Sequence, residues 1–364
     1  MISFKKGDVS MAVLGKDMTF GLFFLNSVAP WKTDAEELIN GLDQIKLADE
    51  LGFQSAWIAE HNARAYGVVS STSVYLAAAA AMTQNIKLGS AVSRLPLHHP
   101  LKVAEDMALV DIISNGRLYL GVGKGYDKLE FDAYNENFDN RHDKYLESLD
   151  ILTTALQNGR VNYSGKFYDI KDIPIYPRPV QNPRPPIFVM VSGNDASMIN
   201  AAKQGHSFVL GGIKNDDTKH KIALYRETAL ASGLTEEYVE EAVARSGKLL
   251  FCFVGNTTEQ AEEDYREGLE WYMSERDNRP TFGVNSRDRN VDYDSFLKSE
   301  NTLVGSPEKV IQDIERYKQE TGLNNIILWM NIGGQRQEKV IKSMKLFSEK
   351  IMPYFTNQSV LSKP

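Results

Sequence analysis

Residues 55–62 read SAWIAEHN, residues 86–92 read IKLGSAV and residues 118–126 read LYLGVGKGY. Each segment contains a short apolar run without polar alternation, which is typical of a parallel strand buried on both faces. Each run ends in glycine or polar residues and is followed by a helical stretch. In open α/β sheets and in (β/α)8 barrels, ligands bind at the carboxyl ends of parallel strands. The three segments therefore predict an α/β protein with its site at that edge.

Similar apolar runs elsewhere in the chain bring the number of predicted strands to eight. They cover residues 20–25, 55–59, 86–92, 118–122, 187–191, 207–210, 249–254 and 325–330. Amphipathic helices are predicted at residues 34–51, 73–82, 102–113, 141–156, 196–204, 218–232, 258–273 and 306–321. Eight alternating units favour a closed (β/α)8 barrel, a TIM barrel, over an open doubly wound sheet. A length of 364 residues suits one such domain with an insertion.

Three stretches depart from the alternation. Residues 158–186 are rich in Tyr, Pro and Gly, and predict an excursion with a hairpin around residues 163–167. Residues 277–302 are long and polar, and predict a mobile lid, because such segments in compact domains are more often lids or binding loops than packing elements. Residues 337–354 predict a closing helix, since apolar residues recur there at helical spacing. These residues are Val340, Met344, Phe347 and Ile351.

The composition argues against several classes of protein. There are 41 basic and 48 acidic residues, a net charge of -7 and no basic stripe, so we expect no nucleic-acid binding. No signal peptide and no apolar run of about 18 residues is evident, which predicts a cytoplasmic protein without a membrane span. The single cysteine, Cys252, lies in an apolar run. We interpret it as a small buried residue rather than half of a disulfide or a metal ligand.

Two strand-end turns could bind an anion. Residues 121–125, GVGKG, lack the spacing and acidic partner of a dinucleotide fingerprint. They either form a tight βα turn or let the backbone and Lys124 approach a phosphate. Residues 192–197, SGNDAS, precede a helix whose free N–H groups favour an anion, unless Asn194 or Asp195 only caps that helix. Two such turns on one barrel face fit a single mononucleotide phosphate.

Histidines are the remaining candidates for chemistry. His61 stands at the carboxyl end of a predicted strand and is a candidate for proton transfer, although a lone histidine is more often a hydrogen-bonded structural residue. His98 and His99 could suggest a metal. Adjacent side chains do not project together, and no third ligand stands at a suitable spacing, so we predict no metal site.

With these residues in view, the chain resembles the bacterial-luciferase-like flavin-dependent oxidoreductases, in particular the luciferase alpha subunits and their monooxygenase relatives. The resemblance runs nearly end to end. Its strongest stretches are residues 51–61, 88–100, 103–126 and 343–354.

This resemblance implies a TIM barrel that binds reduced FMN, made by a separate flavin reductase, at the carboxyl ends of the strands. O2 would add to the reduced ring, and the resulting peroxyflavin would oxidise a small-molecule substrate. The protein would position the reactants and exclude water. The histidine of the family's Glu-His pair corresponds to His61, which is implied to handle protons. Asn62 beside it is assigned to the substrate, and we expect a homodimer.

The resemblance also assigns the cofactor-binding residues. Ala91 and Val92 fall where the family carries a non-prolyl cis peptide beneath the isoalloxazine ring. Lys124 falls where relatives place a basic residue near the flavin phosphate, and Tyr126 ends the same turn. The other phosphate turn carries Ser192, Gly193 and Ser197.

Some positions differ from luciferase. Asn62 replaces the second histidine of the luciferase pair, and Gly123 stands in place of a reactive cysteine. These differences weaken any expectation of a long-chain aldehyde substrate or of light emission. We therefore predict a flavin-dependent monooxygenase of unspecified substrate. Two alternatives are a deazaflavin (F420)-dependent dehydrogenase or reductase, which transfers hydride without oxygen, and a non-catalytic flavin-binding subunit, in which His61 would have no use.

Overall fold

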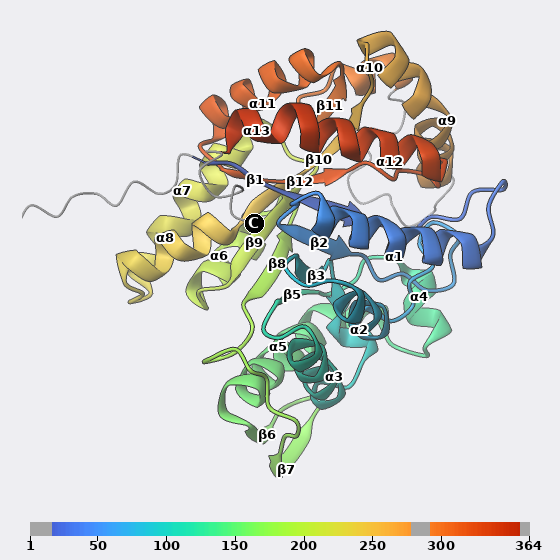
Figure 1. The fold of residues 1–364 in the computed structure, drawn as a ribbon. Helices are drawn as coiled ribbons and strands as arrows, with labels where there is room; N and C mark the ends of the chain where they lie inside the picture. The colour runs from blue at the N-terminus through green and yellow to red at the C-terminus, as the bar shows by residue number, and fades with distance from the viewer. Residues whose placement is uncertain (1–16, 278–291, 357–364) are drawn as a thin grey trace, which may run out of the picture.

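Eight parallel strands form a closed barrel in the computed structural model, which describes residues 17–277 and 292–356 (Figure 1). They are β1 Thr19–Phe24, β2 Ser55–Ile58, β3 Lys87–Ser90, β5 Leu118–Gly123, β8 Ile187–Val191, β9 Ser207–Gly211, β10 Gly247–Val254 and β12 Asn325–Trp329. The ring closes because β10 pairs in parallel with both β9 and β12, and β12 pairs with β1. The predicted TIM barrel is confirmed.

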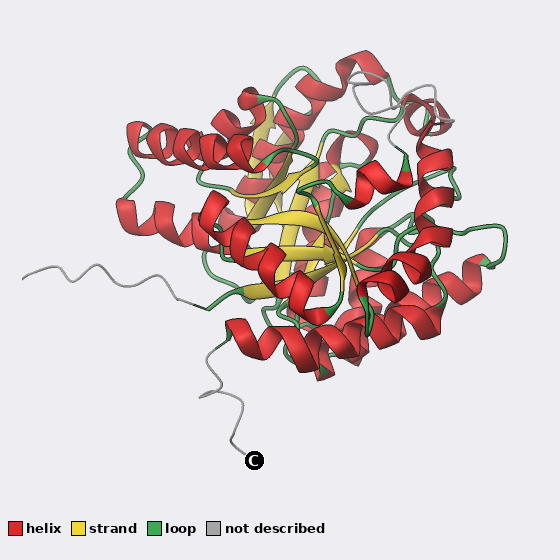
Figure 2. Cartoon of the chain, turned by 90° about the horizontal axis from the view of Figure 1, so that it is seen from above, coloured by secondary structure: helices red, strands yellow, loops and turns green. Residues whose placement is uncertain are grey.

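Helices enclose the barrel, as Figure 2 shows from above. They are α1 Asp34–Glu50, α2 Thr72–Met82, α3 Pro100–Ile113, α5 Arg141–Asn158, α6 Asp195–Lys203, α7 Asn215–Ala231, α9 Thr258–Asp277, α11 Pro307–Thr321 and α12 Gln337–Leu346. Local sequence explains the ends of α11. The Ser306 side chain accepts a hydrogen bond from the N–H of Lys309, and Gly322 takes a left-handed conformation with a φ of 74°.

Side chains alternate along the strands between two apolar cores, as a period of two requires. In β1, Leu22 belongs with Phe20 and Phe24 to the core under the helices, whereas Phe23 points into the barrel. Trp57 of β2 also points inward, and its ring centroid lies 4.9 Å from that of Phe188. Because large aromatic side chains fill the interior, a ligand has room at the rim rather than along the barrel axis.

The excursion and the tail agree with their predictions. The hairpin consists of β6 Arg160–Ser164 paired antiparallel with β7 Asp169–Pro174, and it projects away from the barrel (Figure 1). The tail continues from α12 through a π-helical turn, Phe347–Ile351, into α13 Met352–Phe355. The four apolar residues predicted to face the barrel are all buried.

Several short elements were not predicted. They are β4 Ser93–Arg94, the 3₁₀ turns Leu95–Leu97 and Phe138–Asn140, α4 Lys128–Ala133, α8 Glu236–Arg245, α10 Tyr293–Leu297 and β11 Thr302–Gly305. Most span too few residues to display a hydrophobic period. The third strand was predicted to reach Val92 but ends at Ser90, and the following Ala91–Val92 peptide is cis.

The predicted lid, residues 277–302, lies mostly outside the described residues, since positions 278–291 are not described. Its described end forms α10 and leads into β11, which pairs in parallel with β10. Cys252 of β10 is fully buried, as expected for a small apolar residue. None of the helices in the described ranges has the length and apolar composition that crossing a bilayer requires.

Candidate active site

Three neighbouring strands, β2, β3 and β5, deliver most of the predicted site residues to one part of the rim. Parallel pairing places Ile58 of β2 beside Ser90 of β3, and Ser93 of β4 beside Val122 of β5. The segments that follow these strands therefore lie together, as expected for the carboxyl ends of parallel strands. His61 comes from the first of these segments and is 8% exposed.

His61 forms a buried pair with a glutamate that the sequence did not single out. Its Nδ1 lies 2.9 Å from Oε1 of Glu130 in α4, and the same oxygen accepts the backbone N–H of Asn62 at 3.0 Å. An ionised carboxylate only accepts hydrogen bonds, so the proton of a neutral His61 ring sits on Nδ1. Nε2 then faces the Tyr126 hydroxyl at 3.5 Å. This arrangement leaves Nε2 as the nitrogen able to take up or release a proton at the rim.

The charge of Glu130 is stabilised by its neighbours. Burial by itself raises the pKa of this carboxyl, but the hydrogen bond and charge of His61, the charge of Arg94 and the N–H of Asn62 outweigh burial. The pKa of Glu130 therefore lies below its usual value, and the side chain is ionised at neutral pH.

Arg94 links this pair to a second buried carboxylate. Its guanidinium contacts Glu130 and the Asn62 side chain, and its Nη2 lies 3.4 Å from Oε1 of Glu60. All three charged side chains are almost completely buried. Buried charges persist in a folded protein only when they compensate one another. Arg94 is the counter-ion that Glu60 and Glu130 share at this part of the rim.

His98 and His99 have separate duties. Nε2 of His98 lies 2.7 Å from Oε1 of Glu60, whereas Nδ1 of His99 accepts the N–H of Leu101 and caps α3. Their side chains thus point to different partners. The part of the chain that the structure describes holds no cluster of three or more His, Cys, Asp or Glu side chains suited to a metal ion.

Aromatic side chains form a wall beside His61. The ring of Tyr66 meets the imidazole edge to face at 5.1 Å and stacks on Tyr272 of α9 at 5.6 Å. On another side the ring of Tyr126 lies 5.9 Å from the imidazole. The Ala91–Val92 peptide is half-buried at the same rim. A planar ligand lying there would meet these aromatic side chains along its edge.

The glycines of residues 121–125 accommodate that peptide. A Cβ on Gly121 would lie 1.9 Å from the carbonyl oxygen of Ser90, and a Cβ on Gly123 would lie 2.5 Å from a methyl group of Val92. Any larger residue would collide with the neighbouring segment. Close packing therefore accounts for these two glycines, and Lys124 is the charged residue of the turn that can meet a ligand.

A cavity adjoins this turn between α5 and α6. Its polar lining includes Lys124, His142, Ser197, Asn200, Gln204 and His206. Burial and the nearby Arg184 lower the pKa of His206 to about 3, so that ring is neutral at pH 7. Lys124 is exposed and forms no ion pair with any residue of the described ranges. The cavity is therefore suited to an anion held by Lys124.

The turn before α6 is brought only partly to this cavity. Ser197 lines it, whereas Ser192 and Gly193 lie on the exposed turn outside its lining. Asn194 caps α6 by accepting the N–H of Ala196 at 2.8 Å, as the structural alternative predicted.

Sequence reasoning missed Glu130, Arg94, His98, Tyr66 and His142 as neighbours of the site. One signal could have found Arg94, because a single arginine between a strand end and the apolar residues 95–97 is an unusual buried charge. Glu130 carried no such signal, since it stands on a short helix among other charged residues.

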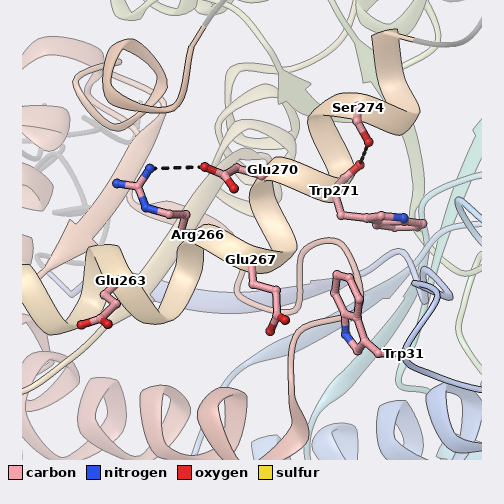
Figure 3. A pocket seen from close by; sticks show the side chains of 7 residues that line it. All are labelled: Trp31, Glu263, Arg266, Glu267, Glu270, Trp271 and Ser274. Carbon is pink, nitrogen blue, oxygen red and sulfur yellow. Dashed lines mark hydrogen bonds and ion pairs between the residues drawn. The ribbon is translucent and has the colours of Figure 1, made fainter.

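A wider hollow lies elsewhere, over the outer face of α9 (Figure 3). Its lining includes Trp31 and Trp271, whose ring centroids are 6.4 Å apart, and the ion pair between Arg266 and Glu270. None of the predicted site residues lines this hollow. The chemically specialised part of the rim is the smaller region around His61 and Lys124.

Comparisons with known proteins agree with this architecture. A family model described as luciferase-like monooxygenase matches residues 18–325. The alkanal monooxygenase alpha chain of the Kryptophanaron alfredi symbiont is 27% identical over 364 aligned residues, covering 94% of this chain and 99% of that one. Limonene 1,2-monooxygenase of Rhodococcus erythropolis is 28% identical, covering 92% of this chain and 86% of that one.

Solved structures share the fold over nearly the whole chain. A monooxygenase from Streptomyces bottropensis superposes with a TM-score of 0.84 at 26% identity, covering 93% of this chain and 100% of that one. The oxygenating constituent of 3,6-diketocamphane monooxygenase from Pseudomonas putida, solved with FMN, superposes with a TM-score of 0.78 at 22% identity. It covers 93% of this chain and 99% of that one.

The ion pairs around Glu130 make a prediction for stability. Glu130→Gln should lower the free energy of unfolding near pH 7 by about 3–5 kcal/mol, because it leaves the buried Arg94 without one of its counter-ions. The folded-state pKa of Glu130 lies below the unfolded value of 4.5, so its contribution is present above that pH and lost as pH falls further. The difference between wild type and variant should therefore shrink below pH 4.5.

Urea denaturation between pH 3 and pH 7, roughly the range in which carboxyl groups titrate, measures this difference. Asp132→Asn is the matched control, since Asp132 lies on the same short helix, is exposed and pairs with Lys128 at the surface. A constant difference across the pH range would contradict a charged Glu130 in the folded protein.

Proposed function

We propose that this chain, which belongs to the luciferase-like monooxygenase family, uses reduced FMN and O2 to oxidise a small organic substrate. The proposal rests on the closeness of three features at the ends of adjoining strands. They are the His61–Glu130 pair, which can transfer a proton, the Ala91–Val92 peptide at the rim, and the cavity next to Lys124, which suits an anion. The family membership makes the protein an oxidoreductase. The incorporation of oxygen and the use of FMN go beyond the family membership and form the proposal.

The rim and the cavity suit one ligand with a planar ring and an anionic tail. Val92 packs directly against Gly123, and Gly123 also lines the cavity next to Lys124. A ring lying on the Ala91–Val92 peptide could therefore extend its tail to Lys124 without leaving the protein surface. Reduced FMN has this shape, and Lys124, His142 and Ser197 offer a cation, an imidazole and a hydroxyl to its phosphate.

The residues around the ring would serve the reaction in distinct ways. When bound, reduced FMN supplies the electrons with which O2 is activated. His61 Nε2 can exchange a proton at the rim, while Glu130 holds the proton on Nδ1 and stabilises the imidazolium form. Tyr66 and Tyr272 exclude water on one side of the imidazole. Asn62 is proposed to border the substrate beside His61; its side chain is held in place by the Tyr134 hydroxyl at 2.8 Å and by Arg94.

A second copy of the chain is proposed to cover α2 and α3, which pack side by side (Figure 1). α2 carries no charged residue, and the two helices together expose Val74, Met82, Leu109, Ile112 and Ile113. Single exposed apolar residues are ordinary, but a group on two adjacent helices is typical of a protein interface. A two-fold axis would let the same surface serve both subunits of a homodimer.

A separate flavin reductase is proposed to supply the reduced cofactor. The turn at residues 121–125, which could have suggested a dinucleotide site, lacks the fingerprint, and its glycines are accounted for by packing. Reduced FMN would then arrive from another protein by diffusion.

The function is tested by His61→Ala in an assay with FMN, NADH and a separate reductase across aldehydes, ketones and aromatic substrates. Wild type should consume O2 and form oxygenated product. The variant should form product about 10²- to 10⁴-fold more slowly and release hydrogen peroxide instead, because proton transfer is lost while flavin binding remains. His61→Gln separates hydrogen bonding from proton transfer, since glutamine cannot cycle a proton near neutral pH.

His99→Ala is the control, because this histidine caps α3 and packs on Tyr168 instead of facing Glu130. Wild-type turnover in His61→Ala with full coupling to O2 would make His61 structural. Hydride transfer with F420, and no O2 uptake with FMN in wild-type protein, would replace the proposal by the deazaflavin alternative.

Lys124→Ala should weaken FMN binding about 10- to 100-fold, which corresponds to the loss of one charge-assisted contact of ~1.5–3 kcal/mol. Quenching of flavin fluorescence measures the dissociation constant. Lys128→Ala is the matched control, since its ammonium group is exposed four residues further along and pairs with Asp132. An unchanged constant in Lys124→Ala would remove this residue from the phosphate site.

Val74→Glu should shift the protein from dimer to monomer, because it places a charge in the proposed interface. Sedimentation equilibrium reports the mass, which for one chain is 40.9 kDa. Leu230→Glu introduces the same charge at an exposed apolar residue of α7 and should leave the dimer intact. A monomeric wild type would refute the proposed interface.

A further inference from the structure

Glu60 belongs to a second polar cluster behind the His61–Glu130 pair. Glu60 and His61 are neighbours in sequence, but their side chains have different partners. Oε1 of Glu60 lies 2.7 Å from Nε2 of His98, and Oε2 accepts the hydroxyl of Thr72 at 3.3 Å. Glu60 is 4% exposed, so its charge depends on these neighbours and on Arg94.

His98 connects this cluster to the surface. Its side chain is 31% exposed, and it lines a small cavity between the first turns of α2 and α3. The other polar groups of that cavity include Glu60, Thr72, Ser93 and Lys102. Lys102 is paired with Asp106 at the surface. His98 is therefore a side chain that joins the buried Glu60 to the surface.

Arg94 is shared between the two clusters. Its guanidinium meets Glu60 on one side, and Glu130 and Asn62 on the other. One positive charge compensates two buried carboxylates only in part. A stronger interaction of Arg94 with Glu60 therefore leaves the charge of Glu130 less compensated. The strength of the Arg94–Glu60 interaction depends on whether His98 also binds Glu60.

We propose that His98 is a positioning residue of the site. By binding Glu60, it limits the interaction of Arg94 with Glu60 and so determines how strongly Arg94 offsets the negative charge of the His61–Glu130 pair. The inference rests on the proposed function only in giving His61 a proton to transfer, because the contacts exist without flavin or substrate. His98 would thus tune the protonation of His61 without touching the ligand.

The proposal fixes the direction of two effects on His61. Without His98, Arg94 interacts more strongly with Glu60 and less strongly with Glu130. The surroundings of His61 then become more negative, which favours the protonated form of His61. Without the Glu60 charge, Arg94 turns to Glu130, and the protonated form is disfavoured. Within the described ranges, His61 also faces Glu130 of α4, Tyr126 after β5 and Tyr66 of its own loop, and both changes leave these residues in place.

The experiment follows the histidine titration by NMR in the flavin-free, full-length protein with ¹³C-labelled histidine. The chain has six histidines, and the spectrum of His61→Ala assigns the signal of His61. His98→Asn should raise the His61 midpoint by roughly 0.5 pH unit or more, since asparagine is too short to hold Glu60. His98→Gln, which can still donate to Glu60, should restore most of the wild-type midpoint.

Glu60→Gln should move the midpoint in the opposite direction, and it tests the same link if His98→Asn does not fold. In the Glu60→Gln background, His98→Asn should cause little further shift, because its route to Arg94 is gone. His99→Asn is the matched control at the adjacent position, since asparagine preserves the cap of α3 and the midpoint should not change.

Midpoints that stay at the wild-type value in both His98→Asn and Glu60→Gln would overturn the proposal. An equal shift in His99→Asn would do the same, because it would mark a general disturbance of the loop. The titration uses neither flavin nor substrate, so a failure of the proposed function would not alter this result.

Discussion

The common direction of the eight barrel strands is the constraint on which the site depends. Because each strand pairs in parallel with its neighbours, every carboxyl end lies at the same rim. Residues as distant in sequence as His61, Arg94 and Glu130 thereby meet within hydrogen-bonding range. The aromatic filling of the barrel interior adds to this effect, since it leaves the rim as the place where a ligand can lie.

Charge compensation then shapes the rim locally. Arg94, Glu60 and Glu130 are nearly excluded from water, and none would be tolerated there alone. Their mutual contacts tie together the ends of β2, the short strand β4 and the helix α4. The same network holds His61 through its Nδ1 and leaves its Nε2 toward the rim. Stability and chemistry therefore rest on the same few side chains, which is common where titratable groups cluster in a cleft.

The anion-suited cavity follows a different principle. Its walls come from α5, α6 and the turn after β5, and its cation is the exposed Lys124 rather than a buried residue. A solvated cation at the mouth of a cavity can bind and release an anion without a large desolvation cost. The glycines of the turn serve packing against Ser90 and Val92, so their contribution to a ligand is indirect.

Much of the fold could be predicted from the sequence, because apolar periodicity and helix caps act over a few neighbouring residues. Each of the eight predicted strand segments contains or overlaps a barrel strand, and the helix predicted at residues 306–321 is α11, bounded by Ser306 and Gly322. His61 and Lys124 were identifiable because they stand at the ends of strands. The partners of His61 were not, since Glu130 is 69 positions away and Arg94 is 33 positions away, and no local pattern encodes such contacts. The sequence by itself determined which segments are strands and which residues reach the rim, whereas only the tertiary structure decided which of those residues touch, because that depends on barrel closure and on the compensation of buried charge.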